Sequence, residues 1–254
     1  MLQLNIYKTI ATKECTRFFR IWTQTLLPPV INQSLYFIIF GTFIGSQIPD
    51  ISGISYLQFI VPGLLLMAVI NSSYSNVVSS FFGSKFQRSI EELLISPASP
   101  KTIIFGYSSG GILRGLIVGL LVYLVSLFFT QFQVENLVAV LAFSFMTAFL
   151  FSLMGLLNGI FAKKFDDISI IPTFILTPLS YFGGIFYTLD SLDGVFLKLS
   201  YLNPIVYMID GFRYGFYGMN HFPVTKSAAV VISLIVVLYL VNFKLIKSGY
   251  GLRS

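Results

Sequence analysis

Long stretches without a charged residue alternate with short charged segments along this chain of 254 residues. A helix that crosses a bilayer needs about 20 predominantly apolar residues, so the charge-free stretches indicate candidate spans. Six stretches approach or exceed that length, and they are free of charged residues except for Arg114 in the third: residues 25–47, 57–83, 102–129, 137–162, 168–186 and 227–243. The pattern therefore predicts an all-α integral membrane protein with six transmembrane helices.

Prolines and glycines inside these stretches predict local irregularity and close packing. Pro172 and Pro178 remove backbone donors from the fifth stretch, so we expect a kink there. Gly111, Gly115 and Gly119 repeat every fourth residue in the third stretch. Small residues at that spacing let membrane helices approach each other closely, and we expect them to serve packing.

An amphipathic helix is predicted over residues 1–24, ahead of the first span. Apolar residues recur there at helical spacing, and four basic residues occupy other positions: Lys8, Lys13, Arg17 and Arg20. Such a helix lies in the membrane interface, with Trp22 at headgroup depth. It is either a simple anchor or also a contact surface for a cytoplasmic partner.

Residues 86–96 form a charged segment between the second and third spans. Three residues lie three and four positions apart, so a helix would place them on one face: Arg88, Glu91 and Glu92. The opposite stripe is apolar: Phe86, Ile90, Leu93 and Leu94. Pro97 and Pro100 would end this helix. The segment is either a docking helix for another chain or an interfacial turn.

The segment at residues 187–226 is forty residues long and rich in aromatic side chains. It is too long for a simple turn and too apolar for a solvated loop. Short helices that enter the outer leaflet and return would accommodate it, provided that protein covers any non-helical backbone. Its aromatic residues are either a gate or an interfacial belt.

Composition and charge set the class of protein and its orientation. Hydrophobic residues make up 56% of the chain and charged residues 10%, against about 25% charged residues in soluble domains, which excludes a soluble fold.

Of 16 basic residues, twelve flank the spans on the side of the two termini and three lie on the other. Because cytoplasmic loops are enriched in Lys and Arg, we expect both termini in the cytoplasm. The dispersed cations form no basic face, so nucleic acid is not an expected partner.

Arg114 is the one basic residue that lies on neither side, because it is inside a predicted span, where it is the one charged side chain. An arginine in the hydrocarbon costs roughly 2.5–3.5 kcal/mol on insertion scales, so its guanidinium needs carbonyls, water or a cavity. Either helix-end carbonyls satisfy it, or it lines the substrate path and meets an anionic headgroup.

Three other chemistries are weakly represented. The run Gly106–Gly110 matches the G-x-S-x-G pattern of hydrolases, but that motif needs a strand-to-helix turn and a general base, and the single histidine, His221, is predicted outside. One histidine cannot build a metal site, and no phosphate-binding loop occurs. The alternative functions are an ATP-independent channel or secondary carrier and, least favoured, an intramembrane hydrolase.

Two segments resemble the ABC-2 type transporter permeases, in a branch of bacterial inner-membrane proteins. The run FQRSIEELLISPASP at residues 86–100 is similar to the family's segment that contains its coupling helix. The run NPIVYMIDGFRY at residues 203–214 is similar to its segment before the last span. Further runs are also similar, such as LNGIFAKKFDDIS, and the resemblance covers the whole chain.

The resemblance implies a permease subunit of an exporter of lipids, polysaccharides or drugs. Two such permeases, here as a homodimer, pair with two separate ATPase subunits, which bind ATP and Mg; this chain itself carries no cofactor or metal. The ATPase would contact six residues: Phe86, Arg88, Ile90, Glu91, Glu92 and Leu93. An extracellular gate would use five others: Asn203, Pro204, Tyr207, Arg213 and Tyr214. Membrane lipids are the remaining expected partners.

Overall fold

Helices and connecting loops make up the parts of the chain that the structure, a computed structural model, describes: residues 1–45, 47–51 and 53–252. The first elements are α1 (Leu2–Arg20), α2 (Trp22–Thr25), α3 (Leu27–Phe37), η1 (Ile38–Ile44), α4 (Tyr56–Phe86), α5 (Ser89–Ile95) and α6 (Pro100–Ser126). They are followed by α7 (Leu137–Phe161), α8 (Asp167–Ile171), η2 (Pro172–Leu176), α9 (Thr177–Tyr181), η3 (Leu189–Ser191), α10 (Gly194–Leu202), α11 (Pro204–Tyr217) and α12 (Val224–Ser248). The all-α prediction is confirmed for these residues.

Four helices within the described ranges are long and apolar enough to cross a membrane: α4, α6, α7 and α12. They correspond to the second, third, fourth and sixth predicted spans. Polar side chains set where two of them begin. The hydroxyl of Ser55 accepts the Gln58 N–H, and Gln58 Oε1 accepts the Ser55 N–H in return, which caps α4. Ser99 accepts the Thr102 N–H at the start of α6.

Charge-free stretches underestimate helices that end in basic residues. The sixth stretch covers residues 227–243, but α12 continues through Lys244 and Lys247 to Ser248. Likewise α4 continues through Lys85 to Phe86. Lysine favours helix, and its long side chain can reach the polar interface while the backbone stays helical.

The first and fifth predicted spans are built from shorter pieces. Helix α3 continues directly into the seven-residue π-helix η1, and α8 continues through the five-residue π-helix η2 into α9. The predicted irregularity is confirmed, because η2 begins at Pro172 and Pro178 lies in the first turn of α9. Each piece alone is too short to cross a bilayer. Ser46 in the first predicted span and Arg253 among the counted cations lie outside the described residues.

Helix α4 occupies the centre of the bundle. In its most apolar stretch 83% of the residues are buried, against 17% in α12, so α4 contacts protein while α12 faces outward. Glycines allow the close contacts. A Cβ added at Gly115 would collide with Ser73 of α4, and one at Gly155 would lie 2.6 Å from the carbonyl oxygen of Tyr74. The predicted packing role of the glycines is confirmed.

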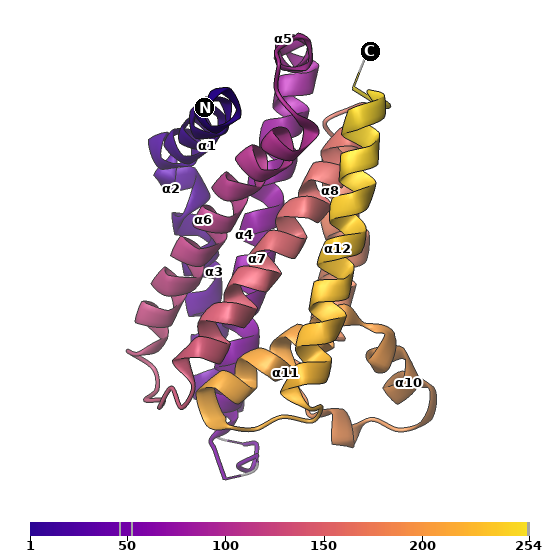
Figure 1. Ribbon diagram of the computed structural model, residues 1–254. Coiled ribbons are helices and arrows are strands. Elements are labelled where there is room, and N and C mark those ends of the chain that lie inside the picture. The colour runs from indigo at the N-terminus through magenta and orange to yellow at the C-terminus, as the bar shows by residue number, and fades with distance from the viewer. Residues whose placement is uncertain (46, 52, 253–254) are drawn as a thin grey trace.

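The bundle has two distinct ends (Figure 1). Helices α1 and α5 and both chain termini lie at one end, and α10 and α11 lie at the other. Helix α11 runs across the bundle and packs against α7, α12 and α4. The predicted short helices within residues 187–226 are therefore present.

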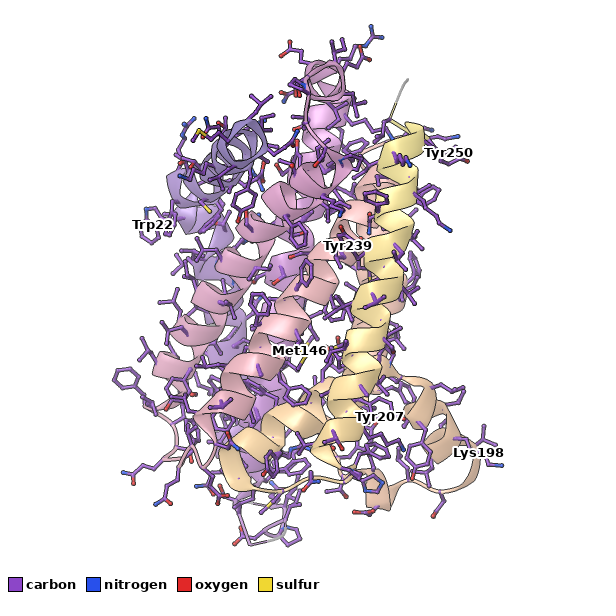
Figure 2. The ribbon with its side chains drawn as sticks, viewed as in Figure 1. Trp22, Met146, Lys198, Tyr207, Tyr239 and Tyr250 are labelled. Carbon is purple, nitrogen blue, oxygen red and sulfur yellow. The ribbon has the colours of Figure 1, made fainter. Side chains whose placement is uncertain are left out.

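The amphipathic helix predicted at residues 1–24 is divided at Ile21, where the backbone leaves helical geometry between α1 and α2. Figure 2 shows the Trp22 side chain projecting away from the bundle, and it is 55% exposed. Its predicted position at headgroup depth fits this exposure.

Candidate functional site

Helix α5 stands at the end of the bundle that also carries both chain termini (Figure 1). Ile90 is buried, and Leu93 and Leu94 pack against a cluster that includes Ile10 of α1. On the other side Glu92 is exposed. Helix α5 therefore keeps an apolar side on the bundle and presents a charged side to its surroundings.

The tip of α5 was not recognised from the sequence. Ile95 is 86% exposed although it is a large apolar residue, and it ends α5 beside the turn at Ser96 and Pro97. Helix α5 therefore exposes an apolar side chain as well as the charged Glu92. The sequence indicated only the charges and the buried stripe of this helix.

The structure corrects the predicted limits of this segment. The helix begins at Ser89 and not at Phe86, which is the last residue of α4 and is 62% exposed. Arg88 lies in the turn between the two helices with φ 61°, a left-handed conformation that reverses the chain. It therefore does not share a helical face with Glu91 and Glu92, and within the described residues no ion pair joins these three.

Gln3 connects α1 to the turn between α5 and α6. Its Nε2 donates to the carbonyl oxygen of Pro97 at 2.5 Å. Its Oε1 accepts from the Ser99 N–H at 3.0 Å and from the Thr102 hydroxyl at 2.7 Å. Gln3 therefore adds a polar connection between α1 and the turn after α5 to the apolar contacts of Leu93 and Leu94. This side chain had no distinguishing signal in the sequence.

A buried polar cluster joins α1 to α4. Glu14 is 0% exposed, and its Oε1 accepts from the Ser80 hydroxyl at 2.6 Å. Arg17 Nε lies 3.5 Å from Glu14 Oε2, and Arg17 Nη2 donates to the backbone and side-chain oxygens of Asn76 at 2.8 and 3.0 Å. Burial raises the pKa of the Glu14 carboxyl, and Ser80 and Arg17 oppose part of that rise.

The burial of Glu14 was not predicted, although the sequence contains a signal for it. Ile10, Glu14 and Phe18 lie four residues apart, and all three are buried on one stripe of α1. A carboxylate on an apolar helical stripe indicates a partner on the neighbouring helix. The basic residues of α1 drew attention to its solvated face instead.

Arg114 lies in α6 and is 9% exposed. Its Nη2 donates to the carbonyl oxygen of Thr25 at 3.0 Å, at the end of α2. This contact fits the interpretation that helix-end carbonyls satisfy the guanidinium, and contact with substrate stays a prediction. The G-x-S-x-G run also lies inside α6, where Ser108 is fully buried, while His221 lies in the loop after α11.

At the opposite end, Asn203 and Pro204 begin α11. Asn203 Oδ1 accepts the Ile205 N–H at 3.0 Å, and Asn203 Nδ2 donates to the carbonyl oxygen of Leu179 at 2.7 Å. This pair of bonds connects the start of α11 to α9. The Tyr207 hydroxyl donates to the carbonyl oxygen of Tyr201 at 2.9 Å.

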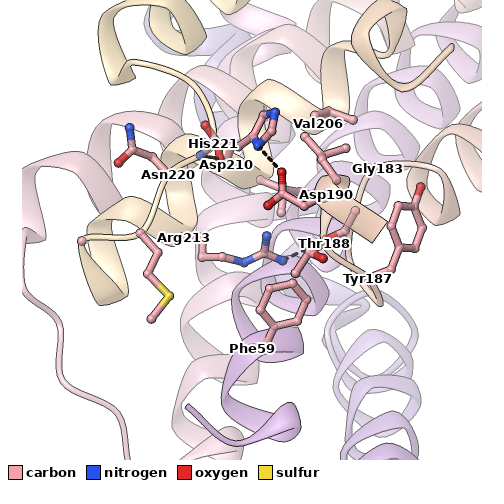
Figure 3. A pocket seen from close by; sticks show the side chains of 15 residues that line it. Phe59, Gly183, Tyr187, Thr188, Asp190, Val206, Asp210, Arg213, Asn220 and His221 are labelled. Carbon is pink, nitrogen blue, oxygen red and sulfur yellow. Dashed lines mark hydrogen bonds and ion pairs between the residues drawn. The ribbon is translucent and has the colours of Figure 1, made fainter. Parts of the chain in front are cut away.

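A cavity of about 370 Å³ lies beside α11 (Figure 3). Arg213 Nη2 donates to the carbonyl oxygen of Gly184 at 2.9 Å, and its Cζ lies 3.9 Å from the centre of the Phe59 ring. His221 Nδ1 lies 3.3 Å from Asp190 Oδ1 on another side of the cavity. The cavity therefore presents charges of both signs.

Asp210 shapes this cavity from α11. Its carboxylate accepts the His221 N–H at 2.7 Å and the Phe222 N–H at 3.1 Å, which closes the loop that follows α11. Burial raises the pKa of the Asp210 carboxyl, and the two backbone N–H groups oppose part of that rise.

Of the five predicted gate residues, only Arg213 lines the cavity. Asn203 and Pro204 begin α11, and Tyr207 and Tyr214 lie outside the cavity lining. The cavity residues that were not predicted include three with ionisable side chains: Asp190, Asp210 and His221. Asp210 and Arg213 lie three residues apart on one helix, a spacing that places them near each other.

Comparison with known proteins places these features in a family. Residues 6–217 match the family described as ABC-2 type transporter. The inner membrane transport permease YadH of Escherichia coli (strain K12) is 59% identical over 247 residues, which cover 97% of this chain and 96% of the relative. More distant relatives include nodulation protein J of Sinorhizobium fredii, 22% identical over 204 residues that cover 78% of this chain and 77% of the relative. These matches confirm the resemblance read from residues 86–100 and 203–214.

Proposed function

Because the chain belongs to the ABC-2 type transporter family, we propose that it is the permease subunit of an ATP-driven exporter. The family and the long apolar helices make it a multi-pass inner-membrane protein and a transporter subunit rather than an enzyme. The export direction and the separate ATPase are the proposed steps beyond that. The observation that carries the proposal is the exposed helix α5 between two membrane helices.

The proposed topology has six spans, with the first formed by α3 and η1 and the fifth by α8, η2 and α9. Both termini and α5 lie in the cytoplasm, and α10 and α11 lie at the outer face. Two facts support this orientation: both termini and α5 share one end of the bundle, and the basic residues outside the spans concentrate at that end.

In the proposed complex, α5 acts as the coupling helix that docks on the ATPase. Glu91, Glu92 and Ile95 provide an acidic and apolar contact surface beside the turn at Arg88. Gln3 would then pass the motion of α5 to α1, and the buried Glu14 with its half-buried partner Arg17 would pass it to α4. The same contacts favour α1 as a transmission element rather than a simple anchor.

The proposed assembly contains two permease subunits as a homodimer and two ATPase subunits that bind ATP and Mg. The proposed substrate is amphiphilic or lipid-linked, or a polysaccharide or drug-like molecule. Aromatic rings near the outer cavity support an amphiphile, since rings pack on apolar bodies and tyrosine hydroxyls bond polar heads. Tyr207, for example, stacks on Phe222 with ring centres 4.8 Å apart.

Co-purification from membranes followed by ATPase assays tests this function. We expect a phosphate-loop ATPase to co-purify, and the double substitution Glu91→Lys and Glu92→Lys, or Ile95→Asp, to lower permease-dependent ATPase activity at least about tenfold. That loss corresponds to roughly 1.4 kcal/mol of contact energy. The control is Asp193→Lys, an exposed acidic residue at the far end of the bundle.

Each alternative function has a distinct outcome in the same experiment. A channel or secondary carrier would transport substrate as the purified chain alone, and the α5 substitutions would leave that transport unchanged. An intramembrane hydrolase would lose activity on Ser108→Ala. Full retention of ATPase stimulation in both α5 variants would contradict the proposed coupling helix.

A further inference from the structure

A second cavity, of about 530 Å³, lies at the end of the bundle that carries α5. The end of α4, the end of α7 and the C-terminal residues after α12 enclose it. Three basic residues line it, Lys85, Arg88 and Lys163, and none of the residues lining it is acidic. We call this cavity the basic pocket. Its size is within the range of about 300–1,000 Å³ that small-ligand sites occupy.

The cations of the basic pocket are incompletely satisfied by the protein. Lys85 Nζ donates to the carbonyl oxygens of Ile160 and Ala162, each at 2.7 Å, which closes the end of α7. An ammonium group has three donors, so one remains for a further acceptor. Lys163 is exposed, and its charge repels that of Lys85. An anion bound between them would relieve that repulsion.

Asp167 acts electrostatically on Lys85, but its carboxylate already accepts hydrogen bonds from the backbone. Asp167 Oδ2 accepts the backbone N–H groups of Lys163 and Lys164 at 2.8 and 3.0 Å. It offsets part of the repulsion at Lys85, but its bonds fix it at the start of α8 and outside the pocket lining. The pocket itself therefore keeps its positive character.

Arg88 occupies a backbone position that favours glycine. It is the one non-glycine residue with positive φ within the described parts of the chain. Glycine adopts this conformation without a steric penalty, whereas a side chain adds one. Arg88 is exposed and lines the basic pocket, to which it brings a positive charge that glycine would lack.

The rim of the basic pocket is aromatic and exposed. Phe161 and Tyr250 pack edge to face with ring centres 6.1 Å apart, and they are 52% and 62% exposed. Phe161 is the last residue of α7, and Tyr250 lies two residues after the end of α12. Aromatic rings in such positions lie at headgroup depth in membranes. The rim thus leads from the cations to the outward-facing, apolar surface of α12.

We propose that the basic pocket binds the phosphate headgroup of an anionic phospholipid from the adjacent leaflet. The phosphate oxygens would accept from Lys85, Arg88 and Lys163, and the acyl chains would pass Phe161 and Tyr250 onto α12. Basic pockets between membrane helices recognise anionic headgroups in this way. The aromatic rim favours a lipid over a soluble anion or an acidic peptide, because only a lipid continues into an apolar phase.

Lipid binding to the purified full chain tests the proposal without the ATPase. The probes are phosphatidylglycerol, phosphatidylcholine with the same acyl chains, and inorganic phosphate, with bound lipid counted by native mass spectrometry. We expect phosphatidylglycerol to be preferred, and each of Arg88→Gly and Lys163→Gln to weaken its binding about fivefold. Lys101→Gln is the matched control, because Lys101 is exposed at the start of α6 and does not line the pocket.

The variants separate binding from folding. Arg88→Gly relaxes the backbone while it removes the charge, so unchanged thermal stability with weaker binding supports the proposal. Equal binding of the two lipids, or an equal loss with Lys101→Gln, would overturn it. Displacement of the lipid by millimolar phosphate would identify a free-anion site and would overturn the lipid assignment. A failure here leaves the ATPase assay of α5 unaffected.

Discussion

Two carboxylates are buried at opposite ends of this helical bundle, and they are satisfied in different ways. Glu14 bonds to side chains of its own helix and of α4, namely Arg17 and Ser80. Asp210 bonds mainly to backbone N–H groups of the loop that follows its own helix, at His221 and Phe222. The first carboxylate joins two helices, and the second closes a loop beside a cavity.

This difference indicates different mechanical roles. Glu14 is fully buried and bonds across from α1 to Ser80 of α4, so we expect those helices to move together. Asp210 lines an open cavity, so the outer loops can change position with little disruption of the packed core. In the proposed exporter, the end with α5 would transmit force and the end with α11 would open and close.

The largest effect is expected from Glu14→Ala. Removing one member of a buried ion pair leaves the other uncompensated and costs about 3–5 kcal/mol when both are fully buried. Arg17 is 30% exposed on its side chain, so we expect a loss of about 2 kcal/mol. Thermal unfolding in detergent measures it, with Lys13→Ala as the exposed control on the same helix. Equal stability of the two variants would mean that the Glu14 cluster does not stabilise the contact between α1 and α4.

A smaller effect is expected from Asp210→Asn at the other end. The amide retains one acceptor oxygen for the loop N–H groups but loses the charge, which lowers the unfolding free energy by about 1–2 kcal/mol. Because the loss is local, we expect faster hydrogen exchange at His221 and Phe222 and no change in α1. The control is Asp193→Asn, whose side chain makes no capping bond. Faster exchange in α1 would contradict the separation of the two ends.

The contact of Arg213 with Phe59 is expected to contribute less. A desolvated cation over an aromatic face contributes about 0.5–2 kcal/mol, and here the separation is 3.9 Å. A double-mutant cycle with Phe59→Leu and Arg213→Met isolates this pair from the packing each change removes. We expect a coupling of about 1 kcal/mol in thermal unfolding. Additive losses would mean that Arg213 is held by its bond to Gly184 alone.

Local patterns predicted the long helices well, because hydrophobicity acts residue by residue. The stretch at 137–162 corresponds to α7 at Leu137–Phe161, and the spacing of Gly111 and Gly115 indicated close packing that the structure contains. The kink region at Pro172 was also predicted, since a missing N–H perturbs any helix. These features depend on a few neighbouring residues.

Features that depend on distant segments were not predicted. The buried state of Glu14 requires Ser80, 66 residues away along the chain, and the bond from Gln3 to Pro97 spans 94 residues. The outer cavity combines Phe59, Asp190 and Arg213 from three separate segments. Periodicity within one helix carries no information about such partners. The sequence therefore indicated the helices but not the side-chain contacts between them.

The smallest effect is the pH dependence that Glu14 adds to stability. Its folded pKa is raised by burial, so the stabilisation is present while the carboxyl is protonated and is lost as pH rises through the raised pKa. Glu14→Gln should remove this slope. Ser80→Ala should move it to higher pH, because the lost hydrogen bond favours the charged form. Melting temperatures from pH 4 to 8, with the exposed Glu92→Gln as control, test both shifts. A Ser80→Ala slope at lower pH would mean that the hydroxyl of Ser80 stabilises the protonated acid, and that Glu14 joins α1 to α4 as a neutral acid rather than as a carboxylate.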